Sequence, residues 1–309
     1  MKVLITSNSF ASCDAGPLRR LEDAGFEVTR NPYGRLLTED ELIDLGRDKD
    51  AIILSTDPFT QKVIVNCPRL KVVSRYGVGT DNVDREALAR AGIPLEITKN
   101  ANSDSVADHA LGLMLDVAHH ISYEAGEYRK GFFKKVLGND LAGSRVGIIG
   151  LGAIGKRTAQ RVRGFGCEVY AFDVSYDEDF QRENRIRKAG IADIFRECDF
   201  ISLHMPAVPE YCGFVDYGKL KMMKPNAILI NTARSELVQK ADLLRALEEG
   251  VIGGYGADVS FNEPNTDDEF KKFPNVIITP HGAAVTVGAV NKMSMTAVEN
   301  VLKYFDDRG

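Results

Sequence analysis

The sequence predicts an α/β protein that consists of two doubly wound parallel-sheet domains. The chain has 309 residues, which is enough for about two domains of ordinary size. Short apolar runs alternate with amphipathic stretches from residue 2 to residue 97, and the alternation starts again at residue 145. Such alternation is typical of a parallel sheet with helices on both faces. Each half of the chain therefore predicts one domain of this kind.

The first half contains expected strands separated by helical stretches. The strands are expected at residues 2–6, 26–29, 51–54, 71–74 and 94–97, and the helices at 18–24, 42–45, 59–65 and 83–91. Thr38 and Glu41 form a capping box, which marks the start of the second helix. Gly46 is expected to end that helix.

A long helix is expected at residues 103–121, because apolar residues recur there on one helical stripe. Beyond it the expected strands are 145–149, 168–172, 200–203, 227–230, 253–258 and 276–278, with helices at 153–163 and 241–249. A final amphipathic helix at 287–305 needs a surface on which to pack its apolar face. Linkers are expected near residues 99–100 and 283–285.

Composition excludes several classes of partner. The 39 Lys and Arg residues are outnumbered by 44 Asp and Glu residues, and the net charge of −5 gives no positive field for nucleic acid. No apolar run approaches the roughly 18 residues that cross a bilayer, so we expect no membrane partner and a cytoplasmic location. The five cysteines and the helix histidines lack the spacing of metal ligands, so no metal is expected.

A glycine-rich turn follows the expected strand at 145–149. Gly150, Gly152 and Gly155 form a G-x-G-x-x-G pattern at the start of a helix. In a dinucleotide site the first glycine makes the turn, the second lets a pyrophosphate approach, and the third brings helix and strand together. Asp173, at the end of the next strand, is placed to bind ribose hydroxyls and to repel a 2′-phosphate. This half of the chain therefore predicts a Rossmann domain that binds NAD rather than NADP.

Three further residues lie in loops after strands of the second sheet. Arg234, Glu263 and His281 can meet at one site, because the carboxyl ends of parallel strands share an edge. Arg234 suits a carboxylate, and His281 can exchange a proton near neutral pH. Glu263 can orient the imidazole and favour its charged form. Each residue taken alone is also compatible with a structural role.

Several segments together resemble the D-isomer-specific 2-hydroxyacid dehydrogenase family, and most closely the short phosphoglycerate dehydrogenase branch without a regulatory domain. The segments are Ser-Arg-Tyr-Gly-Val-Gly-Thr-Asp-Asn-Val-Asp at 74–84, Asn-Ser-Asp-Ser-Val-Ala at 102–107 and Leu-His-Met-Pro at 203–206. The resemblance implies a flavodoxin-like substrate domain at 1–99 plus 286–309 and an NAD-binding Rossmann domain at 100–285. It also implies a homodimer that acts on a small 2-hydroxy or 2-oxo acid.

The resemblance also assigns roles to individual residues. It implies Arg234 as a substrate-binding catalytic residue, Glu263 as the orienting acid and His281 as the acid/base. Besides the three glycines and Asp173, the implied cofactor-binding residues are Ala153, Ile154, His204, Pro206, Thr232, Ala233, Asp258, Gly282, Ala283 and Ala284. The implied substrate-binding residues are Ser55, Arg75, Gly77, Val78 and Gly79, together with Arg234 and His281.

The substrate stays open at this point. D-3-phosphoglycerate and phosphohydroxypyruvate are one candidate pair, which the Arg75 loop favours. Ser55 opposes it, since some phosphoglycerate dehydrogenases carry Arg at about this position. A glyoxylate or hydroxypyruvate reductase is the alternative within the family. A co-regulator or scaffold that senses NAD(H) is the alternative of another class, because a fold does not determine a function.

Overall fold

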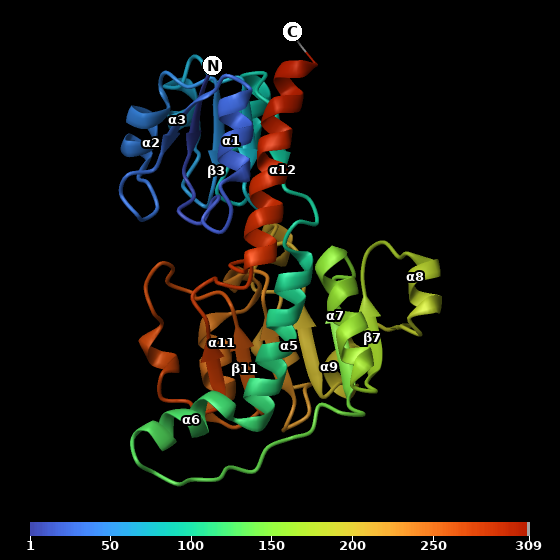
Figure 1. Cartoon of the computed structure of the whole chain (residues 1–309). Coiled ribbons are helices and arrows are strands. Elements are labelled where there is room, and N and C mark those ends of the chain that lie inside the picture. Colours follow the sequence, from blue (N-terminus) through green and yellow to red (C-terminus); the bar gives the residue numbers. More distant parts are fainter. Residues whose placement is uncertain (308–309) are drawn as a thin grey trace. The chain divides into compact units, whose positions relative to one another are not determined.

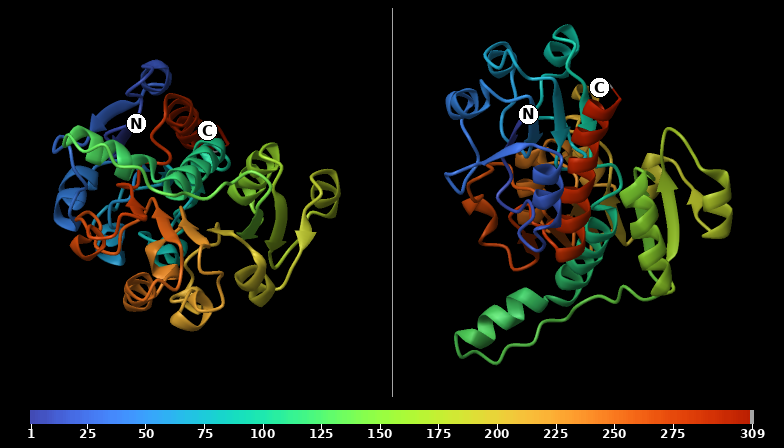
Figure 2. Two further views of the ribbon diagram at one scale, coloured as in Figure 1. Left: turned by 90° about the horizontal axis from the view of Figure 1, so that it is seen from below. Right: turned by 45° about the horizontal axis from the view of Figure 1, so that its top comes forward.

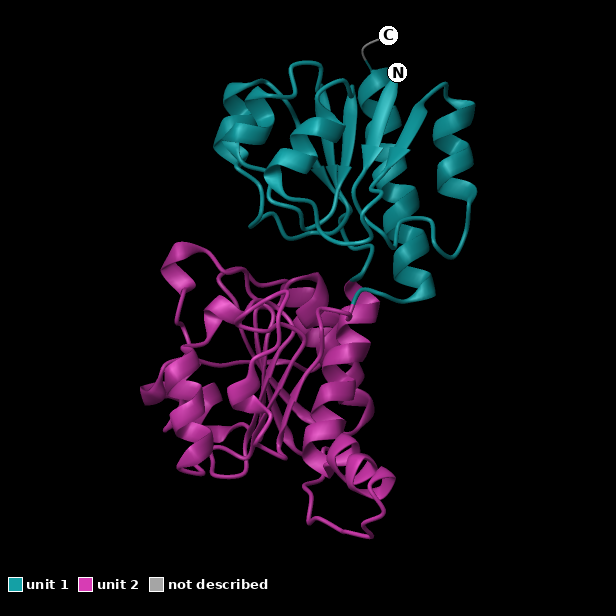
Figure 3. Cartoon of the chain, turned by 90° about the vertical axis from the view of Figure 1, so that its left-hand side faces the viewer, with its two compact units in different colours: residues 1–102, 284–309 teal, residues 103–283 magenta. Residues whose placement is uncertain are grey.

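The computed structural model describes residues 1–307 and divides the chain into two compact units (Figure 3). Unit 1 comprises residues 1–102 and the segment that begins at Ala284, and unit 2 comprises residues 103–283. Residues 100–102 and 284–285 thus fall in unit 1, whereas they were expected in the Rossmann domain at 100–285. Residues 308–309, the end of the expected 286–309 segment, lie outside the described residues.

Unit 1 is built on a parallel sheet of five strands in the order β2-β1-β3-β4-β5. The strands are β1 (Lys2–Ile5), β2 (Glu27–Arg30), β3 (Ala51–Leu54), β4 (Val72–Arg75) and β5 (Leu95–Ile97). The helices are α1 (Gly16–Asp23), α2 (Glu39–Gly46), α3 (Gln61–Val65), α4 (Arg85–Arg90) and α12 (Val287–Asp306). All five strands and the capping box of Thr38 and Glu41 were expected from the sequence.

Apolar residues cover both faces of the unit 1 sheet. Val3 and Ile5 point to the face covered by α1 and α12, whereas Leu4 between them points to the face covered by α2, α3 and α4 (Figure 1). This is the period of two expected along a strand. The last helix thus finds the surface that its apolar stripe requires, since Val298 and Val301 are fully buried in the first of these two cores.

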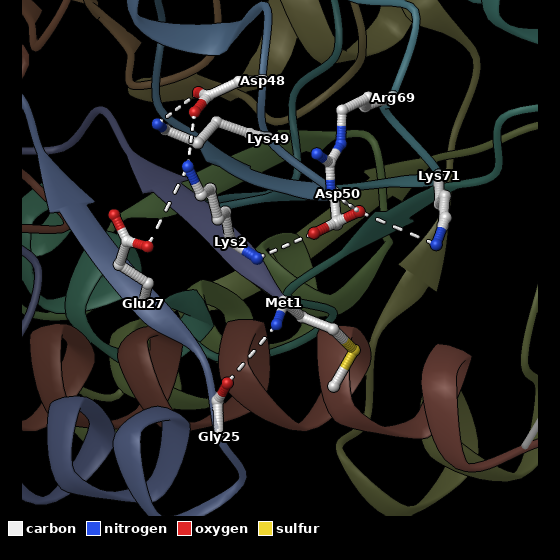
Figure 4. A network of polar contacts seen from close by, with 9 residues as sticks. All are labelled: Met1, Lys2, Gly25, Glu27, Asp48, Lys49, Asp50, Arg69 and Lys71. Carbon is white, nitrogen blue, oxygen red and sulfur yellow. Dashed lines mark hydrogen bonds and ion pairs between the residues drawn. The ribbon is translucent and has the colours of Figure 1, made fainter.

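The amino ends of the unit 1 strands carry a polar network (Figure 4). Its centre is Asp50, which is 3% exposed and accepts a hydrogen bond of 2.8 Å from the backbone N–H of Lys2. Arg69 at 3.3 Å and Lys71 at 3.7 Å pair with the same carboxylate. Burial raises the pKa of Asp50, but these hydrogen bonds and charges outweigh it and leave the pKa below its ordinary value. The network ties four segments of unit 1 together, which are residues 1–2, 25–27, 48–50 and 69–71.

Unit 2 is built on a parallel sheet of seven strands in the order β12-β11-β10-β9-β6-β7-β8. The strands are β6 (Arg145–Ile149), β7 (Glu168–Phe172), β8 (Arg187–Lys188), β9 (Phe200–Leu203), β10 (Ile228–Asn231), β11 (Gly254–Ala257) and β12 (Val276–Ile278). The helices are α5 (Ser103–His119), α6 (Ile121–Arg129), α7 (Ala153–Gly164), α8 (Glu178–Glu183), α9 (Ile191–Glu197), α10 (Tyr217–Leu220) and α11 (Lys240–Glu248). With unit 1, this sheet confirms the predicted class of two parallel α/β domains.

Helices pack on both faces of the unit 2 sheet. Helices α5 and α7 bury their apolar residues against one face, where Ile148 and Ile230 lie (Figure 1). Helices α9, α10 and α11 bury theirs against the opposite face, where Leu229 lies. Because helices cover both faces of the sheet, polar site residues can lie only in the loops at the ends of its strands.

Two helix predictions are wrong in detail. The helix expected at 103–121 ends at His119, because His120 takes a left-handed conformation with φ of 54°. Asp116 then accepts hydrogen bonds from the backbone N–H and the hydroxyl of Ser122, in the first turn of α6. Helix α6 runs in a different direction from α5 (Figure 1). Gly46 is the last residue of α2 rather than a stop beyond it. A Cβ at Gly46 would lie 3.1 Å from Sγ of Cys67, so the glycine serves close packing instead.

Helix α6 and the chain after it extend away from the sheet of unit 2 (Figure 2). Their large apolar side chains are exposed, with Phe133 at 85% and Leu137 at 95%. The chain returns to α5 through a hydrogen bond of 2.9 Å from the N–H of Asn139 to the carbonyl of Ala118. Within residues 1–307, no helix is both long enough and apolar enough to span a bilayer.

Candidate active site

The carboxyl edge of the unit 2 sheet brings the predicted nucleotide-binding residues together. The glycine turn follows β6, Asp173 follows β7, and His204 follows β9. Thr232 follows β10 and Asp258 follows β11. In open parallel sheets ligands bind beyond this edge, where loops from neighbouring strands meet.

The three glycines of the turn differ in what surrounds them. Gly150 has φ of +97°, and a Cβ there would lie 2.6 Å from the backbone of His204. A Cβ at Gly152 would meet no heavy atom within 4 Å, whereas one at Gly155 would overlap the carbonyl oxygen of Gly150. The first glycine thus permits a strained turn, the second faces open space, and the third packs α7 against the turn. These are the environments that a pyrophosphate-binding turn requires.

The start of α7 suits an anion. Gly152 provides no side-chain cap for the helix, and Ala153 and Ile154 are its first residues. Backbone N–H groups in the first turn of a helix have no partner within the helix, and they favour a bound phosphate.

Asp173 is fixed beside this turn. Its carboxylate accepts hydrogen bonds from the backbone N–H groups of Leu151 and Ser175, the latter at 3.0 Å. The carboxylate is therefore already oriented next to the turn, where a ribose with free hydroxyls would bind. Together with the space at Gly152, this shows that the residues present fit NAD.

The expected cofactor residues His204 and Pro206 follow β9 on the same sheet edge. The imidazole Nε2 of His204 lies 2.9 Å from the hydroxyl of Ser202. Burial lowers the pKa of His204 to about 4, which leaves the ring neutral near pH 7. A neutral ring held by a neighbouring serine suits a residue whose backbone shapes the turn at Gly150. Pro206 is exposed after the strand.

The loop that carries Arg234 is held by Asn231, which is fully buried. The Asn231 amide donates a hydrogen bond of 2.7 Å to the carbonyl of Arg234 and accepts one of 3.0 Å from the N–H of Ala233. Thr232 and Ala233 lie partly exposed between them. Arg234 has extended backbone, and its guanidinium donates to the carbonyl of Ala233 at 2.7 Å. The Asn231 side chain therefore fixes the backbone of Ala233 and Arg234.

Glu263 and His281 form a pair. Nδ1 of His281 lies 3.1 Å from Oε2 of Glu263, and each side chain is 41% exposed. Oε1 of Glu263 accepts a hydrogen bond of 3.1 Å from the N–H of Ser260, so both carboxylate oxygens have partners. The acid fixes Nδ1 as a donor and leaves Nε2 for a substrate.

Several effects act on the ionisation of Glu263. Burial raises the pKa of its carboxyl, but the hydrogen bond and charge of His281, the Ser260 N–H and the charge of Arg234 outweigh burial. The pKa of Glu263 therefore lies below its ordinary value, and the group is an anion near pH 7. The charge of Arg234 contributes to this shift, which is the electrostatic link among the three predicted catalytic residues.

The loop that carries Glu263 is tied down by Asp267, whose carboxylate is buried. The N–H of Phe261 donates to Asp267 at 2.7 Å, and Nζ of Lys240 donates to it at 3.1 Å. These contacts close the loop back onto α11. Nothing in the sequence pattern pointed to Asp267 or Lys240.

Asp258 anchors the loop that carries His281. Asp258 is 2% exposed, and its side-chain oxygens accept hydrogen bonds from the N–H groups of Gly282 at 2.8 Å and Ala283 at 2.7 Å. The hydroxyl of Thr279 donates to the same carboxylate at 2.6 Å. His281 itself has φ of 52°, so this loop holds the imidazole residue in a conformation that non-glycine residues rarely adopt.

The candidate substrate residues of unit 1 lie at the carboxyl edge of its own sheet. Arg75 is the last residue of β4 and is 4% exposed, and its guanidinium donates to the carbonyl of Tyr76. Gly77 has φ of +137°, and a Cβ there would lie 2.8 Å from the Arg75 guanidinium. Thr98, fully buried, accepts a hydrogen bond of 2.8 Å from the N–H of Gly77. The glycine is therefore required both by its conformation and by the arginine beside it.

The other three candidates of unit 1 are more exposed. Val78 is 37% exposed, and Gly79 and Ser55 are partly exposed. Ser55 follows β3. Its N–H donates a hydrogen bond of 2.8 Å to the hydroxyl of Thr6, and its carbonyl accepts one of 3.2 Å from the side-chain amide of Asn82. These contacts fix the loop after β3 beside the loop after β1.

Ala284, expected at the cofactor, belongs to unit 1 and packs partly buried against the core beneath α12.

A glycine turn suited to a pyrophosphate, an oriented carboxylate beside it and an acid–imidazole pair on the same sheet edge are typical of an oxidoreductase that uses a pyridine nucleotide. A family model described as "D-isomer specific 2-hydroxyacid dehydrogenase, NAD binding domain" matches residues 111–283. A glyoxylate reductase of Thermococcus litoralis is 35% identical over 85% of this chain and 82% of its own. A D-3-phosphoglycerate dehydrogenase of Mycobacterium bovis is 34% identical over 85% of this chain and 50% of its own.

One solved structure similar to this chain contains the cofactor NAD. The D-lactate dehydrogenase of Aquifex aeolicus, complexed with NAD and lactic acid, is 26% identical with a TM-score of 0.84, covering 99% of this chain and 96% of its own. The chain belongs to the D-isomer-specific 2-hydroxyacid dehydrogenase family. It is an NAD-dependent oxidoreductase, as the sequence predicted.

Proposed function

We propose that the protein reduces a small 2-oxo acid of the glyoxylate or hydroxypyruvate kind to the corresponding 2-hydroxy acid, with NADH as the reductant. The observation that carries this proposal is the pair of His281 and Glu263, whose geometry leaves Nε2 of the imidazole for the oxygen of a substrate. Reduction of a carbonyl needs a proton at that oxygen, and an imidazole held by a carboxylate supplies one.

The cofactor is held by the sheet edge of unit 2. The turn at Gly152 and the start of α7 take the pyrophosphate, and Asp173 takes the ribose. Thr232, Ala233, Gly282 and Ala283 are proposed beside the nicotinamide. When bound, NADH supplies the hydride that reduces C2 of the substrate.

His281 and Glu263 carry the proton. In reduction the protonated imidazole gives the proton on Nε2 to the carbonyl oxygen, and the neutral ring is recharged from solvent. The carboxylate of Glu263 stabilises the imidazolium before transfer and keeps the ring oriented during it. In the oxidative direction the neutral imidazole removes the hydroxyl proton.

Arg234 and the Arg75 loop are proposed to bind the substrate. The guanidinium of Arg234 matches the planar geometry of a carboxylate and stabilises negative charge on the oxygen of the reacting carbon. Arg75 and the backbone N–H groups of Val78 and Gly79 are proposed to bind a carboxylate. Glycine leaves such amides accessible.

Two observations support a substrate without a phosphate. Ser55, at the carboxyl edge of unit 1, offers a hydroxyl rather than a cation. Relatives named glyoxylate reductase match at 33–35% identity. The second candidate, phosphohydroxypyruvate, is favoured by the Arg75 loop and by the relative named D-3-phosphoglycerate dehydrogenase.

A substrate panel tests this proposal. The protein is mixed with NADH and with glyoxylate, hydroxypyruvate, phosphohydroxypyruvate or 2-oxoglutarate, and NADH absorbance is followed. We expect kcat/KM to be highest for glyoxylate or hydroxypyruvate. Hydroxypyruvate and its phosphorylated form differ only in the phosphate, so a clear preference for the latter would establish the second candidate instead. Silence across the panel while NADH binds would refute both.

We further propose that the protein is a homodimer. The resemblance to the family suggests assembly through α5 and its neighbourhood. The side chains of Phe132, Phe133 and Leu137 on the adjoining segment support it, because three large apolar side chains within six residues are each more than half exposed.

A further inference from the structure

The face of α5 toward the His281 loop makes two polar contacts with it. Nε2 of His109 lies 2.9 Å from the hydroxyl oxygen of Thr279. One helical turn earlier, the hydroxyl of Ser105 donates to the carbonyl of Ala283. Residues four apart lie on the same face of a helix, so α5 holds the loop at both of its ends.

The direction of the hydrogen bond between His109 and Thr279 follows from counting protons. A threonine hydroxyl has one proton and two acceptor lone pairs. Two oxygens near the Thr279 hydroxyl can only accept: Oδ1 of Asp258 at 2.6 Å and the carbonyl of Ala257 at 3.2 Å. The proton goes to the nearer and charged Asp258 oxygen. Toward His109 the Thr279 oxygen must therefore accept, so Nε2 of His109 carries a proton and donates it.

This donor stands next to a buried anion. The nearest oxygen of Asp258 lies 3.6 Å from Nε2 of His109, and the carboxylate is 2% exposed. If Nε2 carried no proton, the Thr279 hydroxyl would be drawn to donate toward it and Asp258 would lose a donor. A buried charge that loses a hydrogen bond is costly, and Asp258 is the group that binds the N–H groups of Gly282 and Ala283.

We propose that His109 is a positioning residue for the catalytic imidazole. Its Nε2 proton directs the Thr279 hydroxyl to Asp258, and Asp258 then holds the two amides that follow His281. The inference rests on the proposed role of His281, but the order of the loop can be measured without any turnover.

The first measurement is hydrogen exchange at the amides of Gly282 and Ala283, with the whole chain and no substrate. Replacing His109→Leu removes the donor and is expected to speed exchange at these amides about tenfold or more, as is Thr279→Val. His109→Gln places an amide N–H at a similar reach and is expected to restore exchange to within threefold of the parent protein. His119→Leu, an exposed position on the same helix, is the matched control. Unchanged exchange in His109→Leu overturns the proposal, whatever the protein's activity.

The second measurement uses turnover of the preferred 2-oxo acid. His109→Leu is expected to lower kcat about tenfold with KM for NADH within twofold, and to raise the isotope effect with NADH deuterated at the transferred position, because the misplaced loop slows the chemical step. The double variant His109→Leu/Thr279→Val should lose no more than Thr279→Val alone. Equal losses in the Leu and Gln variants, or losses that add in the double variant, contradict the proposal. A parent protein without turnover would refute the proposed function, and the exchange result would still decide the positioning role.

Discussion

The charge of Glu263 is expected to matter more for catalysis than its hydrogen bond. Glu263→Gln keeps an oxygen that can accept from Nδ1 of His281 but removes the negative charge at 3.1 Å. Two unit charges at this distance attract by about 1.3 kcal/mol in water and about 5 kcal/mol at an effective dielectric constant of 20. Both side chains are 41% exposed, so solvent screens the pair and the lower end applies. A loss of about 1–2 kcal/mol in stabilising the imidazolium corresponds to roughly a 5- to 30-fold loss in rate.

The assay is steady-state reduction of the preferred 2-oxo acid, with NADH affinity measured by fluorescence. We expect Glu263→Gln to lower kcat/KM by that factor and to leave the NADH dissociation constant within twofold. Glu269→Gln is the matched control, because this acid lies in the same part of the chain and pairs with Lys240 at 3.2 Å rather than with the imidazole. A Glu263→Gln variant as fast as the parent protein would refute the charge argument, and so would a variant that fails because it no longer binds NADH.

Three further outcomes follow from the structure. Asp173→Ser removes the anion that would repel a 2′-phosphate, so the ratio of NADP to NAD affinity should rise about tenfold or more, and titration with both cofactors checks it. Asp50→Asn should cost about 1–2 kcal/mol of unfolding free energy near neutral pH. Because the folded pKa of Asp50 is lowered, this contribution is present above 3.8 and is lost as the pH falls through the folded value. Urea unfolding at several pH values should therefore show the gap to the parent protein closing in acid, while a gap that widens would contradict it. Replacing both Phe133 and Leu137 by Ser should shift the protein toward a monomer in sedimentation, and an unchanged mass would exclude this segment from the interface.

Buried strands were predictable because both faces of each parallel sheet are covered, which makes the strands continuous apolar runs. Residues 51–54 are one example, and all four are fully buried. The break at His120 was not predictable, since the apolar stripe of α5 gives no sign of a left-handed residue. Helices α6, α8, α9 and α10 were missed, because none has more than nine residues and so none shows a long apolar stripe. Asp177 and Asp216, whose side chains cap α8 and α10, were local signals for two of them.

Some residues of the candidate site could also be predicted from the sequence, whereas others could not. The glycine turn and Asp173 follow from local spacing, because a phosphate-binding turn constrains neighbouring residues in the chain. The pair of Glu263 and His281 could be anticipated, since both residues lie in loops on the same edge of one sheet. The contacts of His109 join a helix to a loop 170 residues away. No local pattern encodes such a contact, so a helix histidine of this kind is found only in the folded chain.

We propose above that the His281 imidazole supplies the proton for carbonyl reduction. The most direct measurement is a single turnover of bound NADH with the preferred 2-oxo acid in His281→Asn. The Asn amide N–H can donate a hydrogen bond to Glu263, but it is not acidic enough to protonate the carbonyl oxygen. We predict that NADH binds with unchanged affinity and that its oxidation slows by about 10²- to 10⁴-fold. Oxidation within tenfold of the parent rate, with NADH bound, would contradict the account.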